Sequence, residues 1–358
     1  MRAAVLHETG QDTLEVLDDV EAVGFGPGKV RMRIRATGLC HSDLSAMSGV
    51  LPQPAPFVPG HEGAGEILDV GDGVTGLHQG DRALMCWLPA CGSCASCKRG
   101  QTHLCLAGFL NAGTPNFRRP GGEVFGFAGT GTFAEEVVVA ANCAVPIPDD
   151  VPYEIAALIG CGVTTGLGAA LNTARVEAGS SVAVIGCGGV GIATIQGARA
   201  GGAAQIIAVD PVAARREAAL RFGATEAVAP EEFADAKARI TAGEGFDYVF
   251  EVVGKSATTR TAYEMTRRGG TLCIVGAGAL DDTFQVNMFE LFFDEKRILP
   301  SLYGGADVLR SYERAIALWR AGRIDLEGMI THRVRLDEVN DAVDQMRTGT
   351  ALRTCIEI

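Results

Sequence analysis

The chain has 358 residues, of which 47% are hydrophobic and 21% are charged, the proportions of an ordinary globular protein. This length predicts two domains, each large enough to bury a substantial core. The formal net charge of −12 at pH 7 argues against nucleic acid or an anionic membrane as a partner.

The first residues and the cysteines indicate the compartment. The start, MRAAVLHETG, lacks the apolar core of a signal peptide. No segment of the sequence approaches the roughly 20 apolar residues that cross a membrane. Eleven cysteines, an odd number, suit a reducing environment with metal-bound thiolates better than a disulfide framework. We therefore expect a cytoplasmic protein.

Short apolar runs broken by glycine and proline occupy the chain from Arg2 to about Cys161. Examples are VRMRIRATG, GAGEILDVG, DRALMCW and AEEVVVA. Such spacing predicts a mostly β domain with Greek-key character. Within this domain, the glycine-rich segment 107–131 carries several aromatic residues. Its composition fits either a substrate-facing loop or a plain surface loop.

Four cysteines lie close together in this first domain, at Cys91, Cys94, Cys97 and Cys105. Gaps of two, two and seven residues allow the four thiolates to turn inward on one tetrahedral zinc ion. Disulfides are an alternative, although neighbours two residues apart seldom reach disulfide geometry. An iron–sulfur cluster also takes four thiolates, but the missing proline after the last cysteine weighs against it. We expect a closed structural zinc site.

Three further residues have the chemistry of a second metal site. They are Cys40 in GLCHSD, His61 in PGHEGAG and Cys161 in GCGVTTG. Two thiolates and one imidazole leave one position open, which is the ligand set of a catalytic zinc rather than of a closed structural site. Either cysteine alone would be expected to be a small buried apolar residue. The three together have the ligand set of a catalytic zinc, and the family resemblance described below favours this interpretation over buried apolar cysteines.

Beyond Cys161 the pattern changes to strands that alternate with helices. The predicted strands are SVAVIG, QIIAVD, YVFEVVG and TLCIVG, and the predicted helices are TTGLGAALNTARV, GVGIATIQGARAGG, AARREAALRFG and ATTRTAYEMTRRGG. Buried strands alternating with helices of this length predict an α/β fold with a doubly wound parallel sheet of the Rossmann type.

A glycine-rich turn joins the first of these strands to the helix after it. It reads Gly186-Cys187-Gly188-Gly189-Val190-Gly191, the G-x-G-x-x-G pattern that places a dinucleotide's diphosphate at a helix N-terminus. Asp210 ends the next strand, nineteen residues after Gly191. A carboxylate there bonds the adenosine ribose hydroxyls and repels a 2′-phosphate, so NAD is the predicted cofactor. Arg215, close to the same ribose, leaves some room for NADP.

The motifs around the predicted catalytic zinc carry a family resemblance. The second motif extends as Gly60-His61-Glu62, Gly65, Gly71 and Val74. With the other two motifs, it makes the chain resemble the zinc-containing medium-chain alcohol dehydrogenases, from near the N-terminus to Arg353.

The resemblance implies three segments. They are a mostly β, GroES-like catalytic domain over residues 1–162, an NAD-binding Rossmann domain over residues 163–301, and a return to the catalytic domain over residues 302–358. The return would include a helix near SYERAIALWRAG and a closing strand LRTCIEI.

The resemblance also assigns cofactor contacts to single residues. His41 and Arg353 match residues that contact the diphosphate. Thr165 matches a residue beside the nicotinamide, and Val275 matches one whose carbonyl orients the carboxamide.

On the catalytic side, the resemblance assigns three more roles. Ser42 matches the hydroxyl that bonds the substrate oxygen and starts proton removal. Asp43 matches the carboxylate that holds the liganding imidazole. Glu62 matches the acid behind the zinc, proposed in the family as a transient ligand.

The substrate side is only partly defined by the resemblance. Trp87 falls where the family has an aromatic wall of the substrate site, although core packing would explain it equally well. Many family members have a histidine three residues beyond the hydroxyl residue, where this chain has Ser45. Serine cannot act as a base near pH 7, so the proton would leave through the ribose, His41 or water.

These assignments imply a two-zinc, NAD-dependent alcohol dehydrogenase that acts reversibly on primary alcohols, aliphatic or aromatic, as a homodimer or homotetramer. Two other activities also fit the resemblance: oxidation of a thiol adduct of formaldehyde, and a nicotinoprotein that holds NAD permanently. Cys40, His61 and Cys161 argue against a zinc-stabilised binding protein without catalysis, because a purely structural zinc would be closed by a fourth protein ligand.

Overall fold

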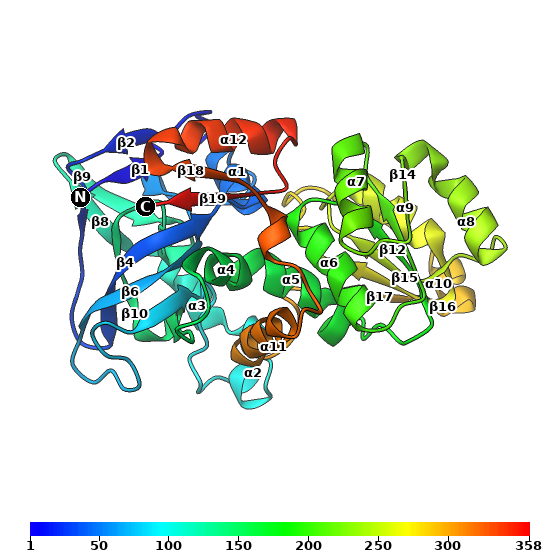
Figure 1. The fold of residues 1–358 in the computed structure, drawn as a ribbon, viewed down its shortest axis with the longest axis horizontal. Helices are drawn as coiled ribbons and strands as arrows, with labels where there is room; N and C mark the ends of the chain where they lie inside the picture. The colour runs from blue at the N-terminus through cyan, green and yellow to red at the C-terminus, as the bar shows by residue number, and fades with distance from the viewer. The chain divides into compact units, whose positions relative to one another are not determined.

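Two compact units make up the structure, a computed structural model that describes residues 1–358 (Figure 1). The first unit contains Met1–Cys161 and Leu326–Ile358, and the second contains Gly162–Asp325. The chain therefore leaves the first unit once and returns to it near its C-terminus.

The first unit is mostly β. Its strands are β1 (Ala3–Val5), β2 (Glu15–Leu17), β3 (Glu21–Ala22), β4 (Lys29–Gly38), β5 (Phe57–Val58), β6 (Glu62–Val70), β7 (Arg82–Met85), β8 (Pro115–Arg119), β9 (Gly122–Gly126), β10 (Glu136–Ala140), β11 (Ala144–Pro146), β18 (Ile330–Arg335) and β19 (Arg353–Glu357). A seven-stranded sheet has the order β11-β7-β6-β4-β19-β18, with β10 also paired to β4. A four-stranded sheet has the order β3-β8-β9-β5, and β1 pairs with β2.

Strand β4 is the centre of the larger sheet, because β6, β10 and β19 all pair with it. Its sequence alternates, so that Val30, Met32 and Ile34 are buried in the core while the arginines between them are exposed. The helices of this unit are α1 (His41–Met47), α2 (Ala95–Lys98), α3 (Leu106–Leu110), α4 (Tyr153–Leu158) and α12 (Val339–Thr348). Helix α12 packs on β18 and β19 (Figure 1).

The second unit is a parallel α/β unit. Its strands are β12 (Ser181–Ile185), β13 (Gln205–Val209), β14 (Glu226–Val228), β15 (Phe246–Glu251), β16 (Thr266–Ile274) and β17 (Arg297–Pro300). Its helices are α5 (Thr164–Gly168), α6 (Gly189–Ala200), α7 (Ala213–Arg221), α8 (Phe233–Thr241), α9 (Ser256–Met265), α10 (Met288–Asp294) and α11 (Val308–Arg320).

All six strands of this unit are parallel, in the order β14-β13-β12-β15-β16-β17. The chain runs from β12 outward to β14 and then, from β15, outward to β17 on the other side. Strand order therefore reverses between β12 and β15, and in sheets of this kind ligands bind beyond the carboxyl ends of the strands at that reversal. The predicted doubly wound sheet is confirmed.

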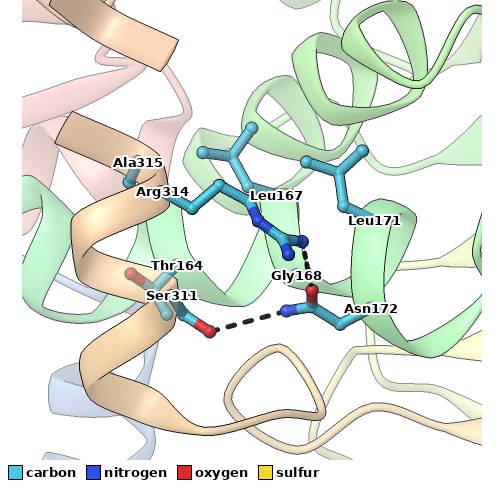
Figure 2. Close-up of a pocket in the computed structure, with 8 residues that line it drawn as sticks. All are labelled: Thr164, Leu167, Gly168, Leu171, Asn172, Ser311, Arg314 and Ala315. Carbon is cyan, nitrogen blue, oxygen red and sulfur yellow. Dashed lines mark hydrogen bonds between the residues drawn. The ribbon is translucent and has the colours of Figure 1, made fainter. Parts of the chain in front are cut away.

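One expected boundary is wrong. The sequence placed residues 302–325 in the returning segment, but they belong to the second unit. Helix α11 packs against α5, and the side chain of Gln196 exchanges hydrogen bonds with the backbone of Asp325. Figure 2 shows the small hollow between α5 and α11, where Arg314 donates to Asn172 Oδ1 at 2.6 Å. The return therefore begins at Leu326.

One predicted helix also ends early. The sequence predicted a helix over residues 257–270, whereas α9 ends at Met265 and Thr266 already pairs with Phe246 as the first residue of β16. The register of β16 shifts just after this pair, where the chain carries Gly269 and Gly270. The two glycines let the strand bend, whereas they would weaken a helix.

One helical run, Tyr153–Thr173, is long and apolar enough to cross a membrane, which the sequence analysis did not anticipate. Its most apolar window is 83% buried inside the structure. Burial of this extent is that of a core helix, which passes the same test of length and composition.

The turn between β12 and α6 depends on two glycines whose backbones nearly touch. Gly186 has φ = +94°, and a Cβ on Gly191 would overlap the Gly186 carbonyl oxygen. Gly188, between them, has φ = −72°, and a Cβ there would meet nothing within 4 Å. Packing inside the protein therefore requires glycine at 191 but not at 188.

We predict that Gly191→Ala destabilises the protein while the matched variant Gly188→Ala does not. Overpacking of this kind typically costs about 1–3 kcal/mol, and a backbone carbonyl cannot move aside as a flexible side chain can. Thermal unfolding of both variants measures the effect. Equal melting temperatures for Gly191→Ala and the unmodified protein would contradict the prediction.

Candidate active site

The first unit brings four metal-binding side chains together. The ligand atoms of Cys40, His61, Glu62 and Cys161 all lie within 4.8 Å of one another, and all four residues are buried. Cys40, His61 and Cys161 were predicted from three motifs, and Glu62, which follows His61 in the second motif, from the family resemblance. The fold gathers them from parts of the chain up to 121 residues apart.

Three elements hold these ligands. In the pairing of β4 with β6, Gly38 is opposite Glu62, so Cys40 just after β4 and His61 just before β6 meet at the same end of the sheet. Cys161 lies on a π-helical turn, Ile159–Val163, that directly follows α4. Such turns carry one more residue than an α-helical turn and are frequent at functional sites.

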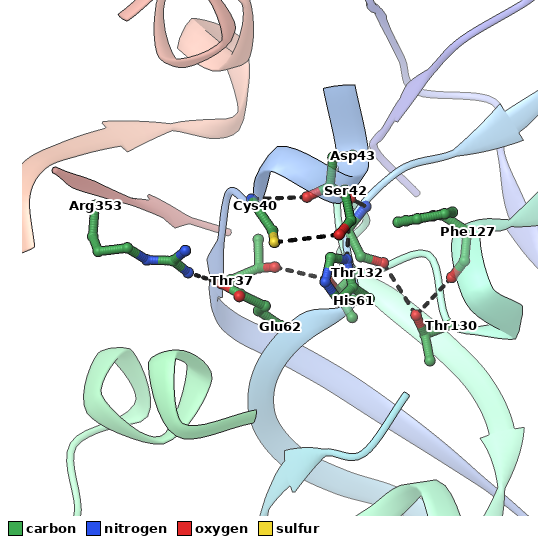
Figure 3. A network of polar contacts seen from close by, with 11 residues as sticks. Thr37, Cys40, Ser42, Asp43, His61, Glu62, Phe127, Thr130, Thr132 and Arg353 are labelled. Atoms are coloured by element: carbon green, nitrogen blue, oxygen red, sulfur yellow. Dashed lines mark hydrogen bonds and ion pairs between the residues drawn. The ribbon is translucent and has the colours of Figure 1, made fainter. Parts of the chain in front are cut away.

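Asp43 fixes the orientation of this site, as Figure 3 shows. Its buried carboxylate accepts hydrogen bonds from the backbone N–H groups of Cys40 and Gly60, both at 2.9 Å. Its Oδ1 also lies 3.3 Å from His61 Nδ1. With Nδ1 facing the carboxylate, Nε2 of the imidazole is left free to bind a metal.

The electrostatics of the site favour a cation. The side chain of Cys161 bonds the Cys40 sulfur and holds the pKa of the Cys40 thiol well below its usual range, against the opposing effect of burial. Burial alone would lower the pKa of His61, but the Asp43 carboxylate and the Cys40 sulfur together outweigh burial and raise that pKa to about 10. A buried thiolate beside a second cysteine and an imidazole is the donor set that zinc prefers.

Arg353 forms an ion pair with Glu62, and both side chains are buried (Figure 3). Sequence analysis expected Arg353 to contact a diphosphate, and in this unit its guanidinium is directed at Glu62. Gly38 makes the pair possible, because a Cβ at this position would overlap the Glu62 carboxylate. The pair therefore holds the acid behind the three other ligands.

Aromatic rings surround the imidazole. Phe127 and Trp87 lie edge-on to His61, with ring centroids 5.2 Å and 6.1 Å away. Phe109 in turn lies edge-on to Trp87 at 6.2 Å. Sequence analysis named Trp87 but not the two phenylalanines, although both belong to the aromatic, glycine-rich segment 107–131 that it singled out.

The four cysteines of the second cluster also converge, as predicted from their spacing. The Sγ atoms of Cys91 and Cys97, and those of Cys94 and Cys105, are each 4.0 Å apart. Disulfide sulfurs would be about 2.05 Å apart. Zinc–sulfur bonds of about 2.3 Å in a tetrahedron place neighbouring sulfurs about 3.8 Å apart. The spacing fits a shared zinc ion.

Backbone donors reinforce this cluster. The N–H groups of Cys91, Cys94 and Cys97 donate to the sulfurs of Cys105, Cys91 and Cys94, at 3.3, 3.3 and 3.5 Å. The Ser93 hydroxyl bonds the Cys91 sulfur and lowers the pKa of that thiol to about 5. Burial, with the neighbouring Cys94, raises the pKa of Cys97 to about 12. Cys97 would therefore lose its proton only when a bound cation stabilises its thiolate beside the other sulfurs.

In the second unit, the glycine-rich turn and Asp210 lie together. Asp210 follows β13, and its carboxylate accepts hydrogen bonds from the N–H groups of Cys187 at 2.8 Å and Val212 at 2.9 Å. The nearest Arg215 nitrogen is 4.0 Å from the same carboxylate. The predicted ribose-binding acid is thus anchored to the predicted diphosphate-binding turn.

The start of α6 is suited to an anion. Gly188 is its N-cap and no side chain caps the helix, so its first N–H groups are open to a ligand. The space beside Gly188 is open, since a Cβ there would meet no atom within 4 Å. A diphosphate could therefore approach the backbone at this point. These features fit a dinucleotide.

The remaining predicted residues divide between the units. In the first, His41 is exposed at the start of α1, and the Ser42 Oγ lies 3.7 Å from the Cys40 sulfur. In the second, Thr165 is half-buried in α5, and the N–H of Val275 donates to the carbonyl of Glu251 at 2.8 Å.

Known proteins share this arrangement. A family model described as "Alcohol dehydrogenase GroES-like domain" matches residues 26–149, and one described as "Zinc-binding dehydrogenase" matches residues 189–319. An NDMA-dependent alcohol dehydrogenase of Amycolatopsis methanolica is 37% identical, over 99% of this chain and 98% of its own length. An S-(hydroxymethyl)glutathione dehydrogenase of Escherichia coli is also 37% identical, over 99% of both chains.

A solved structure, that of benzyl alcohol dehydrogenase from Acinetobacter calcoaceticus, superposes with a TM-score of 0.92 at 29% identity, covering 100% of this chain and 99% of the other. The family, the fold class and the enzyme class expected from the sequence are confirmed by these matches. The chain belongs to the zinc-binding alcohol dehydrogenases.

Proposed function

We propose that this protein is an NAD-dependent dehydrogenase that interconverts primary alcohols, aliphatic or aromatic, and their aldehydes. The observation that carries the proposal is the convergence of Cys40, His61 and Cys161 in one buried site. Since Glu62 is paired with Arg353, three ligands remain and the fourth position is open to substrate.

Two zinc ions and one NAD complete the proposed enzyme. Cys91, Cys94, Cys97 and Cys105 would hold the first ion, and Cys40, His61 and Cys161 the second. When bound, the catalytic zinc would supply a Lewis acid for the alcohol oxygen, and NAD a two-electron acceptor. A cytoplasmic location is part of the proposal, since all eleven cysteines are free and thiolate ligands need a reducing environment.

The protein's own groups would then orient the substrate and move its proton. Ser42, beside the Cys40 sulfur, accepts the hydrogen bond of the substrate hydroxyl and starts removal of its proton. Asp43 keeps the His61 ring in place. Ser45 lies one turn along α1 from Ser42 and offers no base for the next transfer. The proton therefore leaves by another route, through the ribose, His41 or water.

The rings around His61 support an apolar substrate. Trp87, Phe127 and Phe109 form a contiguous set of edge-on contacts beside the proposed metal site. Flat aromatic walls suit an aliphatic chain or an aromatic ring next to the reacting carbon. This supports alcohol oxidation over the oxidation of an anionic thiol adduct of formaldehyde.

A second candidate is a nicotinoprotein, which keeps its NAD bound and passes electrons to another acceptor. The NDMA-dependent relative supports the nicotinoprotein activity. The S-(hydroxymethyl)glutathione dehydrogenase, which is equally similar at 37% identity, supports oxidation of a thiol adduct of formaldehyde. The ligand sets and the glycine-rich turn would serve all three activities.

For the cofactor, NAD is proposed over NADP because the Asp210 carboxylate would face the additional phosphate. Like charges brought together can cost several kcal/mol, and about 3 kcal/mol corresponds to roughly a hundredfold in affinity. Arg215, 4.0 Å from the carboxylate, offsets part of this repulsion. Thr165, Val275, His41 and Arg353 are proposed as further cofactor contacts, by family resemblance.

We also propose that the enzyme is a homodimer or homotetramer. Strand β17 is an edge strand that pairs only with β16, and the adjacent α10 exposes Met288, Phe289, Phe292 and Phe293. An open strand edge beside an exposed apolar face favours association. A solution mass of one 37.3 kDa chain by light scattering would contradict the proposal.

The function is tested with a panel of alcohols and aldehydes, each assayed with added NAD or NADP, with and without glutathione-like thiols. Turnover of primary alcohols with free NAD and without thiol is expected. Turnover only after addition of thiol would instead identify the formaldehyde-adduct activity. Turnover that needs an artificial electron acceptor, with no response to added NAD, would identify the nicotinoprotein. Equal kcat/KM with NAD and NADP would remove Asp210 from cofactor selection.

Cys97→Ser and Cys161→Ser should separate the two zinc sites. The first is expected to lower thermal stability and soluble yield, because metal binding at a closed cysteine site is also folding free energy. The second should leave a folded protein with one zinc ion and no turnover. Metal analysis and thermal unfolding distinguish the two results. One zinc ion or none in freshly purified, active, unmodified enzyme would contradict the assignment.

Ser42→Ala should reduce alcohol oxidation by about 10²–10⁴-fold, the usual loss when one acid–base participant is removed. Ser45→Ala serves as the control on the same helix and should have little effect. Both are measured as pH–rate profiles under conditions in which chemistry, not release of the reduced cofactor, limits the rate. Near-normal turnover of Ser42→Ala would exclude Ser42 from proton transfer.

A further inference from the structure

Cys161 reaches the proposed zinc site differently from its partners. Cys40 and His61 are adjacent through the strand pairing of β4 with β6. Cys161 comes from a helical segment that lies on the sheet, so its distance from the other two ligands depends on where α4 sits. The polar contacts at the start of α4 therefore bear on the metal site.

The start of α4 is fastened to the sheet by Arg82, on β7. Its guanidinium donates to the carbonyl oxygens of Asp149 and Val151, the second at 2.7 Å, just before the helix begins. The same guanidinium lies 4.2 Å from the ring centre of Tyr153, the first residue of α4. One side chain thus holds both the approach to the helix and its first residue.

Tyr153, which contacts the Arg82 guanidinium, also bonds a residue of β6. Its hydroxyl donates to Glu66 at 3.3 Å, and Glu66 is paired across the sheet with Arg82 and bonded to Arg35 at 3.0 Å. Arg82, Tyr153 and Glu66 therefore form a three-residue clamp between α4 and the strand that begins next to His61.

The clamp lies away from the metal site along the same two elements, at the start of α4 and in the middle of β6. Eight residues of helical chain separate Tyr153 from Cys161, about 12 Å at 1.5 Å per residue. Five residues of extended chain separate Glu66 from His61, about 16 Å. Between them, Ile155, Ala156, Ala157 and Leu158 are fully buried, so α4 can slide or turn only as a unit.

We propose that Arg82, Tyr153 and Glu66 are positioning residues that set the Cys161 sulfur against Cys40 and His61. This inference rests on the proposed function, because it presupposes zinc at those three ligands. The clamp acts by fixing the axial position of α4, and none of its members touches the metal or the substrate.

The test measures zinc retention, not turnover. Unmodified protein, Arg82→Met and Tyr153→Phe are equilibrated with increasing concentrations of a zinc chelator, and the zinc left per chain is determined. The Cys161→Ser variant identifies which ion belongs to the catalytic site. Arg82→Met should weaken retention of that ion by about tenfold, the lower end of the effect of residues that support ligands. Tyr153→Phe keeps the ring and loses only the hydroxyl, so it should also weaken retention of that ion, but by less than Arg82→Met.

Glu154→Gln is the matched control. Glu154 is on the same helical turn, but its carboxylate bonds Arg333 of β18 at 2.8 and 3.0 Å, away from β6 and β7. Its replacement should leave zinc retention unchanged, and the four-cysteine ion should be retained equally in all variants.

Three outcomes are decisive. Unchanged retention of the catalytic ion in both clamp variants would overturn the inference. Parallel loss of both ions with a lower melting temperature would also overturn it, since that is the effect of general destabilisation. If unmodified protein binds no zinc sensitive to Cys161→Ser, the proposed function itself fails, and the clamp has no site to position.

Discussion

The antiparallel pairing of β4 with β6 is the constraint on which the active site depends. It places Gly38 opposite Glu62, and with them the two chain segments that carry Cys40 and His61. The pairing itself requires the glycines of the second motif, because a Cβ on Gly65 would overlap the Arg33 carbonyl oxygen and one on Gly63 would lie 2.6 Å from Thr132. These two glycines of the metal motif are therefore needed for packing, while His61, just before them, supplies the candidate metal ligand.

The proposed dinucleotide site of the second unit is formed mainly by backbone, unlike the metal sites of the first unit. There the backbone itself forms the site: a turn with φ = +94° at Gly186, an uncapped helix N-terminus and one anchored carboxylate. Side chains define the metal sites, whereas the absence of side chains defines the proposed dinucleotide site. This difference explains why the two halves of the protein have such unlike sequence signals.

The candidate metal ligands could be predicted from the sequence because zinc chemistry restricts residue type and spacing within short motifs. It also found the parallel sheet, whose buried strands and helices alternate clearly. It did not find the pairing of Arg353 with Glu62, which joins residues 291 positions apart. Nor did it identify Phe109 and Phe127, since aromatic contacts leave no periodic signal. The return of the chain at Leu326 was missed because α11 has the amphipathic pattern of a surface helix in either unit.

The π-helical turn at Ile159–Val163 makes one ligand depend on chain length as well as on residue identity. A π turn contains one residue more than an α turn, and each residue of a regular helix advances the side-chain direction by about 100°. Deleting Ile159 or Gly160, between α4 and Cys161, would give a more regular helix whose cysteine points elsewhere. Among descendants of such a gene, insertions and deletions here would be selected against even where every ligand is kept, whereas surface loops could vary freely in length.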